Sequence, residues 1–132
     1  MRRLLIASVA LIALIGSACS SGGGGSSSPS AAETGCTAAT ATDFTGESAF
    51  TLTIKGFAYH PNCFSAKNNS TITITNEDSV THTFTVIGTG VDIAIDAGKS
   101  VTKPGANLAP ATYDFHCTIH PQITGTLIVV AA

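Results

Sequence analysis

Residues 113–123 read Y-D-F-H-C-T-I-H-P-Q-I, and this stretch brings a thiol and an imidazole to the end of a predicted β-strand. Side chains alternate between the two faces of a strand, so Cys117 shares a face with the aromatic residues and points into the core. Pro121 cannot continue a regular ladder, and the chain must turn after Cys117. A turn of this length swings His120 back over the Cys117 sulfur, so we expect the two side chains to be neighbours.

A second imidazole is predicted to reach the same place from residues 82–86, which read H-T-F-T-V. Alternation puts His82 on the inward face of this segment together with the phenylalanine and the valine. A thiolate beside an imidazole selects copper or zinc, and two imidazoles with one thiolate form the trigonal ligand set of blue-copper sites. Taken alone, each residue is more often part of a core or a surface. Their joint pattern predicts one metal ion bound by His82, Cys117 and His120.

Segments rich in Thr, Val, Ile and Phe recur at short intervals along the rest of the chain. They predict strands at residues 50–57, 71–75, 82–86, 91–95, 100–103, 111–117 and 125–130. Turn signals such as Asn68-Asn69 and Pro104-Gly105 separate these segments, and no stretch after the N-terminal region has apolar residues at helical spacing. The predicted fold class is therefore all-β, a two-sheet Greek-key β-sandwich.

In the order and spacing of these residues, the domain resembles the cupredoxins, particularly the small plastocyanin-like and amicyanin-like proteins. Those families carry a first His after an Asn-acidic turn, and this chain has Asn76-Glu77-Asp78 before His82. They also carry a late Cys-x-x-His-x-x-Met loop, which is matched here by Cys117, His120 and Ile123. The resemblance covers roughly residues 50–130. It implies a cupredoxin-like sandwich that binds one type 1 copper ion.

Ile123 departs from the family pattern, because a Met at this position would be a weak axial ligand and a hydrocarbon side chain has no lone pair. Losing the axial donor destabilises Cu(II) more than Cu(I), so we expect a raised reduction potential. Two alternatives remain open. Gln122 could turn inward and offer its amide oxygen, which would oppose the rise, or Ile123 could mark a site that has lost its function.

The resemblance implies a one-electron carrier that meets redox partner proteins of the cell envelope, and we expect a monomer. A copper-binding or copper-delivery protein of the envelope, and a non-redox interaction module on the same frame, are the alternatives. We do not expect an enzyme. Multicopper oxidases hold a trinuclear cluster with H-x-H motifs, whereas His116-Cys117-Thr118 lacks the second His, and no nucleophile pattern fits better than a metal site.

The N-terminus reads as an export signal over residues 1–18, with Arg2 and Arg3 before an apolar run that is too short to span a bilayer. Residues 16–19 read G-S-A-C and resemble a bacterial lipoprotein processing site, which predicts a lipid on Cys19. Gly16 stands where Leu is usual, and ordinary signal cleavage is the alternative. Residues 19–35 are rich in Gly and Ser and predict a flexible tether to the domain at 36–132. We expect a protein anchored by lipid outside the cytoplasm, in the periplasm or at the cell surface.

The chain has four cysteines, and export implies an oxidising compartment. If Cys117 is a thiolate ligand and Cys19 takes a lipid, Cys36 and Cys63 remain as a disulfide pair; two free thiols are the alternative. Loss of the signal would leave four lysines against eight acidic residues. No basic cluster is available to neutralise phosphates, so nucleic acid is not an expected partner.

Overall fold

The computed structural model describes residues 35–105 and 107–132, and this part of the chain consists of β-strands and loops. The strands are β1 (Thr42–Asp43), β2 (Ala49–Ile54), β3 (Tyr59–His60), β4 (Cys63–Lys67), β5 (Thr71–Asn76), β6 (His82–Val86), β7 (Asp92–Ile95), β8 (Ser100–Lys103), β9 (Ala111–His116) and β10 (Thr124–Val130). Among these residues there is no helix long and apolar enough to cross a membrane. The predicted signal at 1–18, the lipid on Cys19 and the tether up to residue 34 lie outside the described residues.

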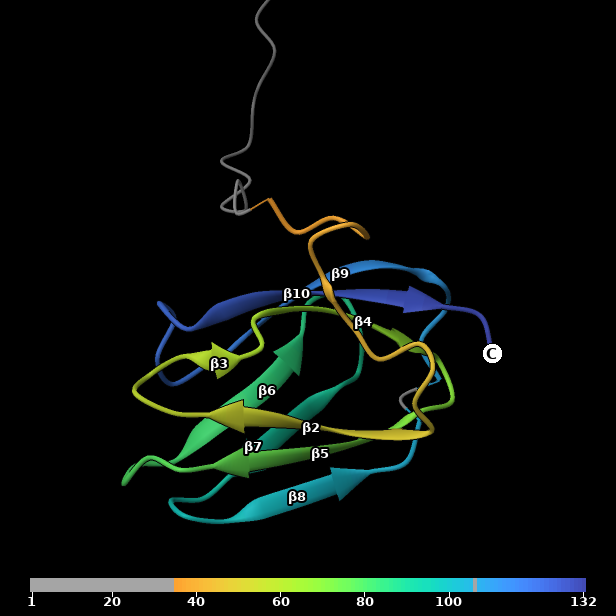
Figure 1. Ribbon diagram of the computed structural model, residues 1–132. Helices are drawn as coiled ribbons and strands as arrows, with labels where there is room; N and C mark the ends of the chain where they lie inside the picture. The colour runs from red at the N-terminus through yellow and green to blue at the C-terminus, as the bar shows by residue number, and fades with distance from the viewer. Residues whose placement is uncertain (1–34, 106) are drawn as a thin grey trace, which may run out of the picture. The chain divides into compact units, whose positions relative to one another are not determined.

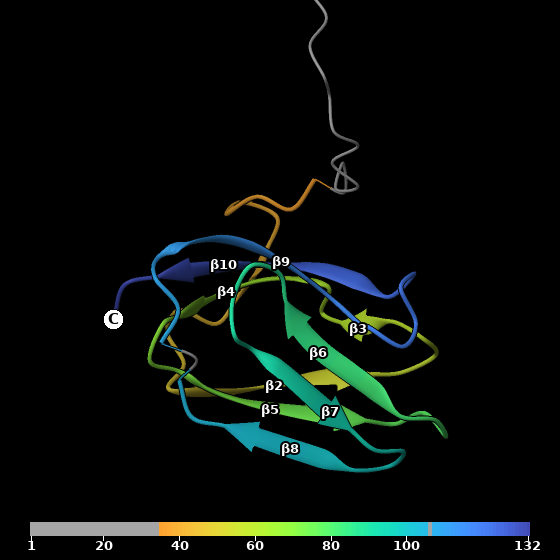
Figure 2. The same cartoon turned by 180° about the vertical axis from the view of Figure 1, so that it is seen from behind.

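The strands form two sheets that face each other (Figure 1, and from behind in Figure 2). One sheet has the order β1-β4-β10-β9-β6-β7 and the other has the order β3-β2-β5-β8. β4 runs parallel to both β1 and β10, and β2 runs parallel to β5; the remaining neighbours are antiparallel. The all-β, two-sheet Greek-key prediction is confirmed.

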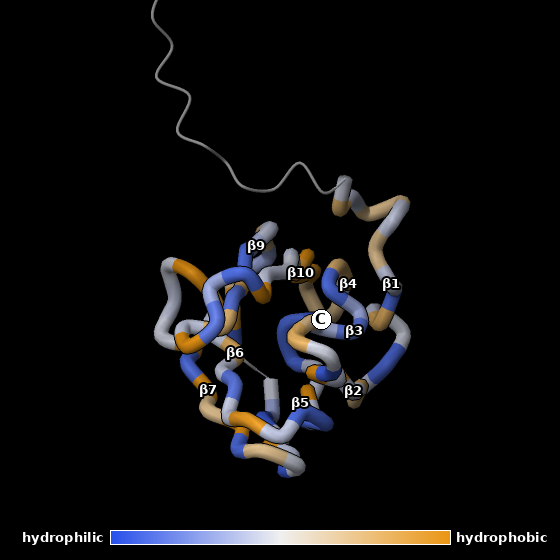
Figure 3. Tube along the Cα trace, turned by 90° about the vertical axis from the view of Figure 1, so that its left-hand side faces the viewer, coloured by the Kyte–Doolittle hydropathy of each residue, from blue (hydrophilic) through white to orange (hydrophobic). Residues whose placement is uncertain are grey.

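The core lies between the two sheets, and in strands such as β2, β5 and β7 it follows from the alternation of buried and more exposed side chains. In β5 the isoleucines and Asn76 are buried, while the threonines between them lie nearer the surface. Figure 3, which looks roughly along the strands, shows hydrophobic and hydrophilic positions interspersed along the tube. Leu52, Ile54, Phe64 and Phe115 are fully buried. The same alternation directs His82, the first residue of β6, and Cys117, the residue after β9, toward the interior.

Seven of the strands correspond to predicted segments, and three do not. The predicted strand at 50–57 is too long: β2 ends at Ile54, because Gly56 and Phe57 have positive φ angles and turn the chain into β3. β1, β3 and β4 were not predicted. In β4, Phe64, Ser65 and Ala66 are buried in succession, so the period of two on which the prediction relied is absent.

Cys36 and Cys63 form a disulfide, as cysteine parity predicted, with a Cα–Cα distance of 5.6 Å. The bond joins the segment before β1 to the first residue of β4 and closes a separation of 27 residues. Among the described residues Cys117 is the free cysteine, and it is buried. The disulfide therefore leaves the thiol of Cys117 available to the candidate site.

Candidate metal centre

His82 is the first residue of β6, and its side chain is fully buried. Its backbone pairs with Ile95 of β7, so the ring is carried by a strand and not by a loop. The Nε2 atom lies 2.9 Å from Oδ2 of Asp78. Because a carboxylate only accepts hydrogen bonds, Nε2 carries the proton and Nδ1 presents a lone pair to the interior.

Cys117 follows β9 and is also fully buried. The backbone N–H of Thr83 donates to its Sγ over 3.2 Å, which ties β6 to the residue after β9. Burial alone raises the pKa of the Cys117 thiol, but the backbone N–H of Thr83, the two neighbouring imidazoles and the backbone of His120 outweigh it and lower the pKa to about 6. The site therefore favours a thiolate at neutral pH, which is the form that binds metals.

His120 lies in the loop between β9 and β10 and is half-buried. Its Nδ1 is 3.1 Å from Nδ1 of His82 and 3.8 Å from Sγ of Cys117, and the His82 Nδ1 to Cys117 Sγ distance is also 3.8 Å. A triangle with these sides has a centre about 2.1 Å from each corner, within the usual range of metal–nitrogen and metal–sulfur bonds. The three donor atoms thus fit one ion.

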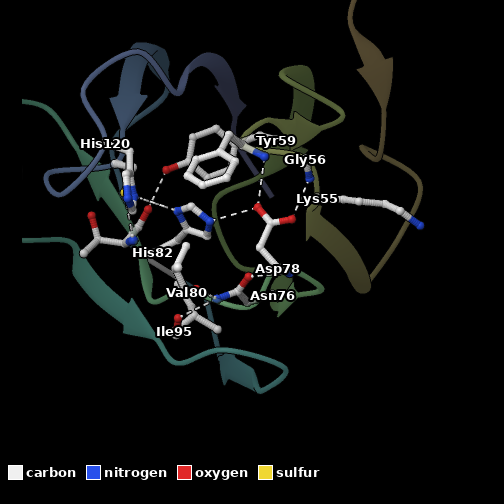
Figure 4. Close-up of polar contacts among 12 residues, drawn as sticks. Lys55, Gly56, Tyr59, Asn76, Asp78, Val80, His82, Ile95 and His120 are labelled. Atoms are coloured by element: carbon white, nitrogen blue, oxygen red, sulfur yellow. Dashed lines mark hydrogen bonds and ion pairs between the residues drawn. The ribbon is translucent and has the colours of Figure 1, made fainter.

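The turn before β6 orients His82. The Asn76 side chain is buried; its Nδ2 donates to the carbonyls of Val80 (2.8 Å) and Ile95 (2.9 Å), and its Oδ1 accepts the N–H of Asp78 (3.0 Å). Figure 4 shows the Asp78 carboxylate between the His82 ring and the backbone at Gly56. The carboxylate of Asp78 is therefore fixed where it can accept the His82 proton.

Asp78 also binds the loop between β2 and β3. Its Oδ1 accepts the N–H of Gly56 (2.6 Å), and its Oδ2 accepts the N–H of Phe57 (2.9 Å). The N–H of Phe57 is the largest influence on Asp78, and together with Gly56 and His82 it holds the pKa of this carboxyl below its usual range. Lys55, which pairs with Glu77 at 2.9 Å, points away from the site in Figure 4.

The family of the chain follows from a comparison with protein-family models. The model of the cupredoxin-like domain matches residues 29–129, which is most of the chain. The chain belongs to the cupredoxin-like family. A comparison with curated proteins found no significant match.

Solved structures with the same fold include amicyanins. A reduced amicyanin mutant superposes on this cupredoxin with a TM-score of 0.53 and 22% identity, over 64% of this chain and 84% of that chain. An oxidised amicyanin mutant has a TM-score of 0.53 and 22% identity, over 63% of this chain and 83% of that chain. The Cu-containing nitrite reductase (NirK) from Thermus scotoductus SA-01 has a TM-score of 0.52 and 20% identity, over 62% of this chain and 22% of that chain. At these identities the likeness establishes the fold alone.

The ligand set of this cupredoxin suits copper. His82, Cys117 and His120 are the group of potential metal ligands among residues 35–105 and 107–132, and their donor atoms all lie within 4.8 Å of one another. Two imidazole nitrogens and one thiolate are the soft, trigonal donors typical of type 1 copper. The structure thus brings together all three residues that the sequence pattern indicated and supports a site for one type 1 copper ion.

Ile123 closes the loop that carries His120 through backbone hydrogen bonds. Its carbonyl accepts the N–H of Cys117 (3.0 Å), and its N–H donates to the carbonyl of His120 (2.9 Å). The Ile123 side chain is buried at 2% exposure, whereas Gln122 is exposed. This arrangement agrees with the expected parity and favours Ile123 over Gln122 as the side chain that faces the interior.

The sequence interpretation missed three residues that contact the ligands. Asp78 was noted only as part of a turn, although it lies four residues before His82 and binds its ring. Thr83 and Phe57 carried no signal, because a backbone N–H and an aromatic ring can contact a ligand from almost any position. The other two histidines stay outside the ligand cluster: His60 is exposed, and His116 is the half-buried last residue of β9.

Proposed function

We propose that this cupredoxin is a mononuclear type 1 copper protein that carries one electron at a time. The observation that carries the proposal is the convergence of two imidazole nitrogens and a thiolate-favouring Cys117 on one point at the end of a β-sandwich. Copper, when bound, supplies a one-electron couple between Cu(II) and Cu(I). The function of the chain is to keep its own ligands in nearly the same place in both states.

The frame suits this role because the fully buried ligands belong to strands or directly follow them. His82 begins β6, Cys117 follows β9, and the N–H of Thr83 links the two through the sulfur. Ligands held by packed strands move little when the charge at the site changes, which lowers the reorganisation that each transfer requires. A rigid trigonal site is therefore better suited to electron transfer than to releasing its ion.

Electron transfer and copper delivery can be separated by experiment. We expect the copper-loaded protein to exchange electrons rapidly with its own oxidised form and to lose copper slowly to a chelator. Rapid loss of copper with slow self-exchange would instead indicate a delivery protein. The likeness to the nitrite reductase does not support a catalytic role for this chain, since only 22% of that enzyme's chain is matched.

We propose further that Ile123 occupies the axial position without coordinating the metal. Support comes from its place three residues after His120 and from its buried side chain. A hydrocarbon there gives no electron density to Cu(II) and surrounds the site with an apolar shell, so both effects raise the reduction potential. The protein should then be a strong oxidant for its class.

The proposed location is the outside of a membrane, with residues 1–18 as a lipoprotein signal and a lipid on Cys19. Residues 19–35 would tether the domain at 36–132, which would meet redox partner proteins of the envelope as a monomer. The charged start, the apolar run and the G-S-A-C stretch support this arrangement. Mass spectrometry of the exported protein tests it: an unmodified Cys19, or a chain that retains residues 1–18, would refute the anchor.

A further inference from the structure

Phe57 has an unfavourable backbone conformation and an unfavourable environment. It occupies the second position of the two-residue turn between β2 and β3, which the paired Lys55 and Ala58 backbones close with hydrogen bonds of 3.0 and 3.2 Å. Its φ angle is 58°, and that of Gly56 is 61°. Turns of this kind favour glycine at the second position, and a bulky residue there is strained. The Phe57 side chain is also 47% exposed.

The hydrogen bond of Phe57 does not explain why the residue is aromatic. Its N–H donates to Asp78, but a glycine at this position would supply the same N–H without strain. Strain that persists beside a functional site indicates that the side chain has a role there. The explanation must therefore come from the ring.

The Phe57 ring contacts both imidazoles of the candidate metal centre. It lies edge-on to His82 with ring centres 5.4 Å apart and edge-on to His120 with ring centres 5.1 Å apart. These distances and near-perpendicular planes are the favourable geometry for aromatic pairs. One side chain from the β2–β3 turn thus packs against ligands from two other parts of the chain.

The two imidazoles differ in what else holds them. His82 donates from Nε2 to Asp78, which fixes its orientation. The hydrogen bonds of the His120 ring within the described residues all involve Nδ1, which faces His82 and Cys117. Its outer nitrogen has no carboxylate or carbonyl partner among these residues. On the side away from Nδ1 the His120 ring is therefore held by packing, to which the Phe57 ring contributes an aromatic contact.

We propose that Phe57 is a positioning residue for His120, with a ring that keeps Nδ1 of the imidazole directed at His82 and Cys117. Asp78 orients the first imidazole by a hydrogen bond, and Phe57 orients the second by packing. Because Asp78 also binds the Phe57 N–H, the two supports are joined. The inference deepens the proposed function and rests on the same copper site.

Phe57→Gly in the full-length protein tests the inference, because it removes the ring while also removing the backbone strain. We expect Cu(I) to leave the variant for a chelator about tenfold faster than it leaves the wild-type protein, the lower end of the effect of losing a ligand support. The apo variant should nevertheless unfold at an equal or higher urea concentration. If Phe57 only stabilised the fold, its replacement would speed copper release and would also lower the urea concentration at which the apo protein unfolds.

Two further variants complete the test. Phe57→Tyr keeps the ring and should retain the wild-type release rate, whereas Ile87→Gly removes a comparably exposed apolar side chain from the turn after β6 and should also leave the rate unchanged. A wild-type release rate in Phe57→Gly, or a lower unfolding midpoint accompanying faster release, would overturn the inference.

A measurement without copper separates this inference from the proposed function. NMR relaxation of the His120 ring in the apo protein should show greater motion in Phe57→Gly than in Phe57→Tyr. Equal motion in the two variants would overturn the positioning role, whatever the metal. A wild-type protein that binds no copper would refute the proposed function, and the ring motion would still decide the role of Phe57.

Discussion

Oδ2 of Asp78 lies 2.9 Å from Nε2 of His82, so a carboxylate four residues before this ligand decides which ring nitrogen faces the metal centre. Replacing Asp78 with Ala removes the acceptor and leaves His82 free to change tautomer and to rotate. We predict a loss of about 10- to 100-fold in copper affinity, the usual effect of removing a partner of a ligating histidine. Competition with a chelator of known affinity measures the change.

Asp114→Ala is the matched control for Asp78→Ala. Asp114 also accepts a hydrogen bond, from the hydroxyl of Thr126 at 3.1 Å, but its partner is not a ligand. The control removes the same charge and should keep copper affinity within a small factor of the wild type. Equal affinities in both variants would show that Asp78 does not support His82.

Ile123→Met should lower the reduction potential. The substitution places a thioether where the hydrocarbon lies, and a weak axial donor stabilises Cu(II) more than Cu(I). Ile123→Leu, which changes shape without adding a donor, is the control and should keep the potential close to that of the wild type. Electrochemistry on all three proteins gives the comparison. A potential that stays the same or rises in Ile123→Met would mean that residue 123 is not axial.

Gly125→Ala should destabilise the fold by about 1 to 3 kcal/mol, as expected for overpacking of a well-packed site. A Cβ on Gly125 would collide with the Phe115 ring and with the Asn62 carbonyl oxygen. Gly46→Ala is the control, since nothing lies within 4 Å of the added carbon. Urea unfolding of the apo proteins should separate the two. Similar free energies of unfolding would show that the Phe115 ring and the backbone at Asn62 can shift to admit a methyl group.

The ligand residues were predictable because their signals are local. Alternation along a strand is enough to turn His82 and Cys117 inward, and a proline shortly after a cysteine is enough to require a turn that returns His120. The all-β class follows from the same alternation and from the turn residues between segments. These features needed no knowledge of which strands pair.

The parts that were missed depend on contacts between distant segments. Ser65 is buried in β4 because the segment at Asp43 lies against it. Nothing near Ser65 in the sequence indicates that this segment packs there. The predicted strand wrongly included Phe57, because aromatic residues usually favour strands. In the structure Phe57 instead adopts a left-handed backbone conformation beside the ligands. Tertiary contacts overrode local preference at both places.

The visible absorption spectrum of the copper-loaded protein tests the central proposal most directly. Transfer of charge from the Cys117 thiolate to Cu(II) should give an intense band that colours the wild-type protein, and Cys117→Ser should abolish it because a serine oxygen is not a soft donor. His60→Ala, which removes an exposed histidine outside the ligand cluster, should keep the band. A wild-type protein that binds Cu(II) without this band, or a band that persists in Cys117→Ser, would contradict the account.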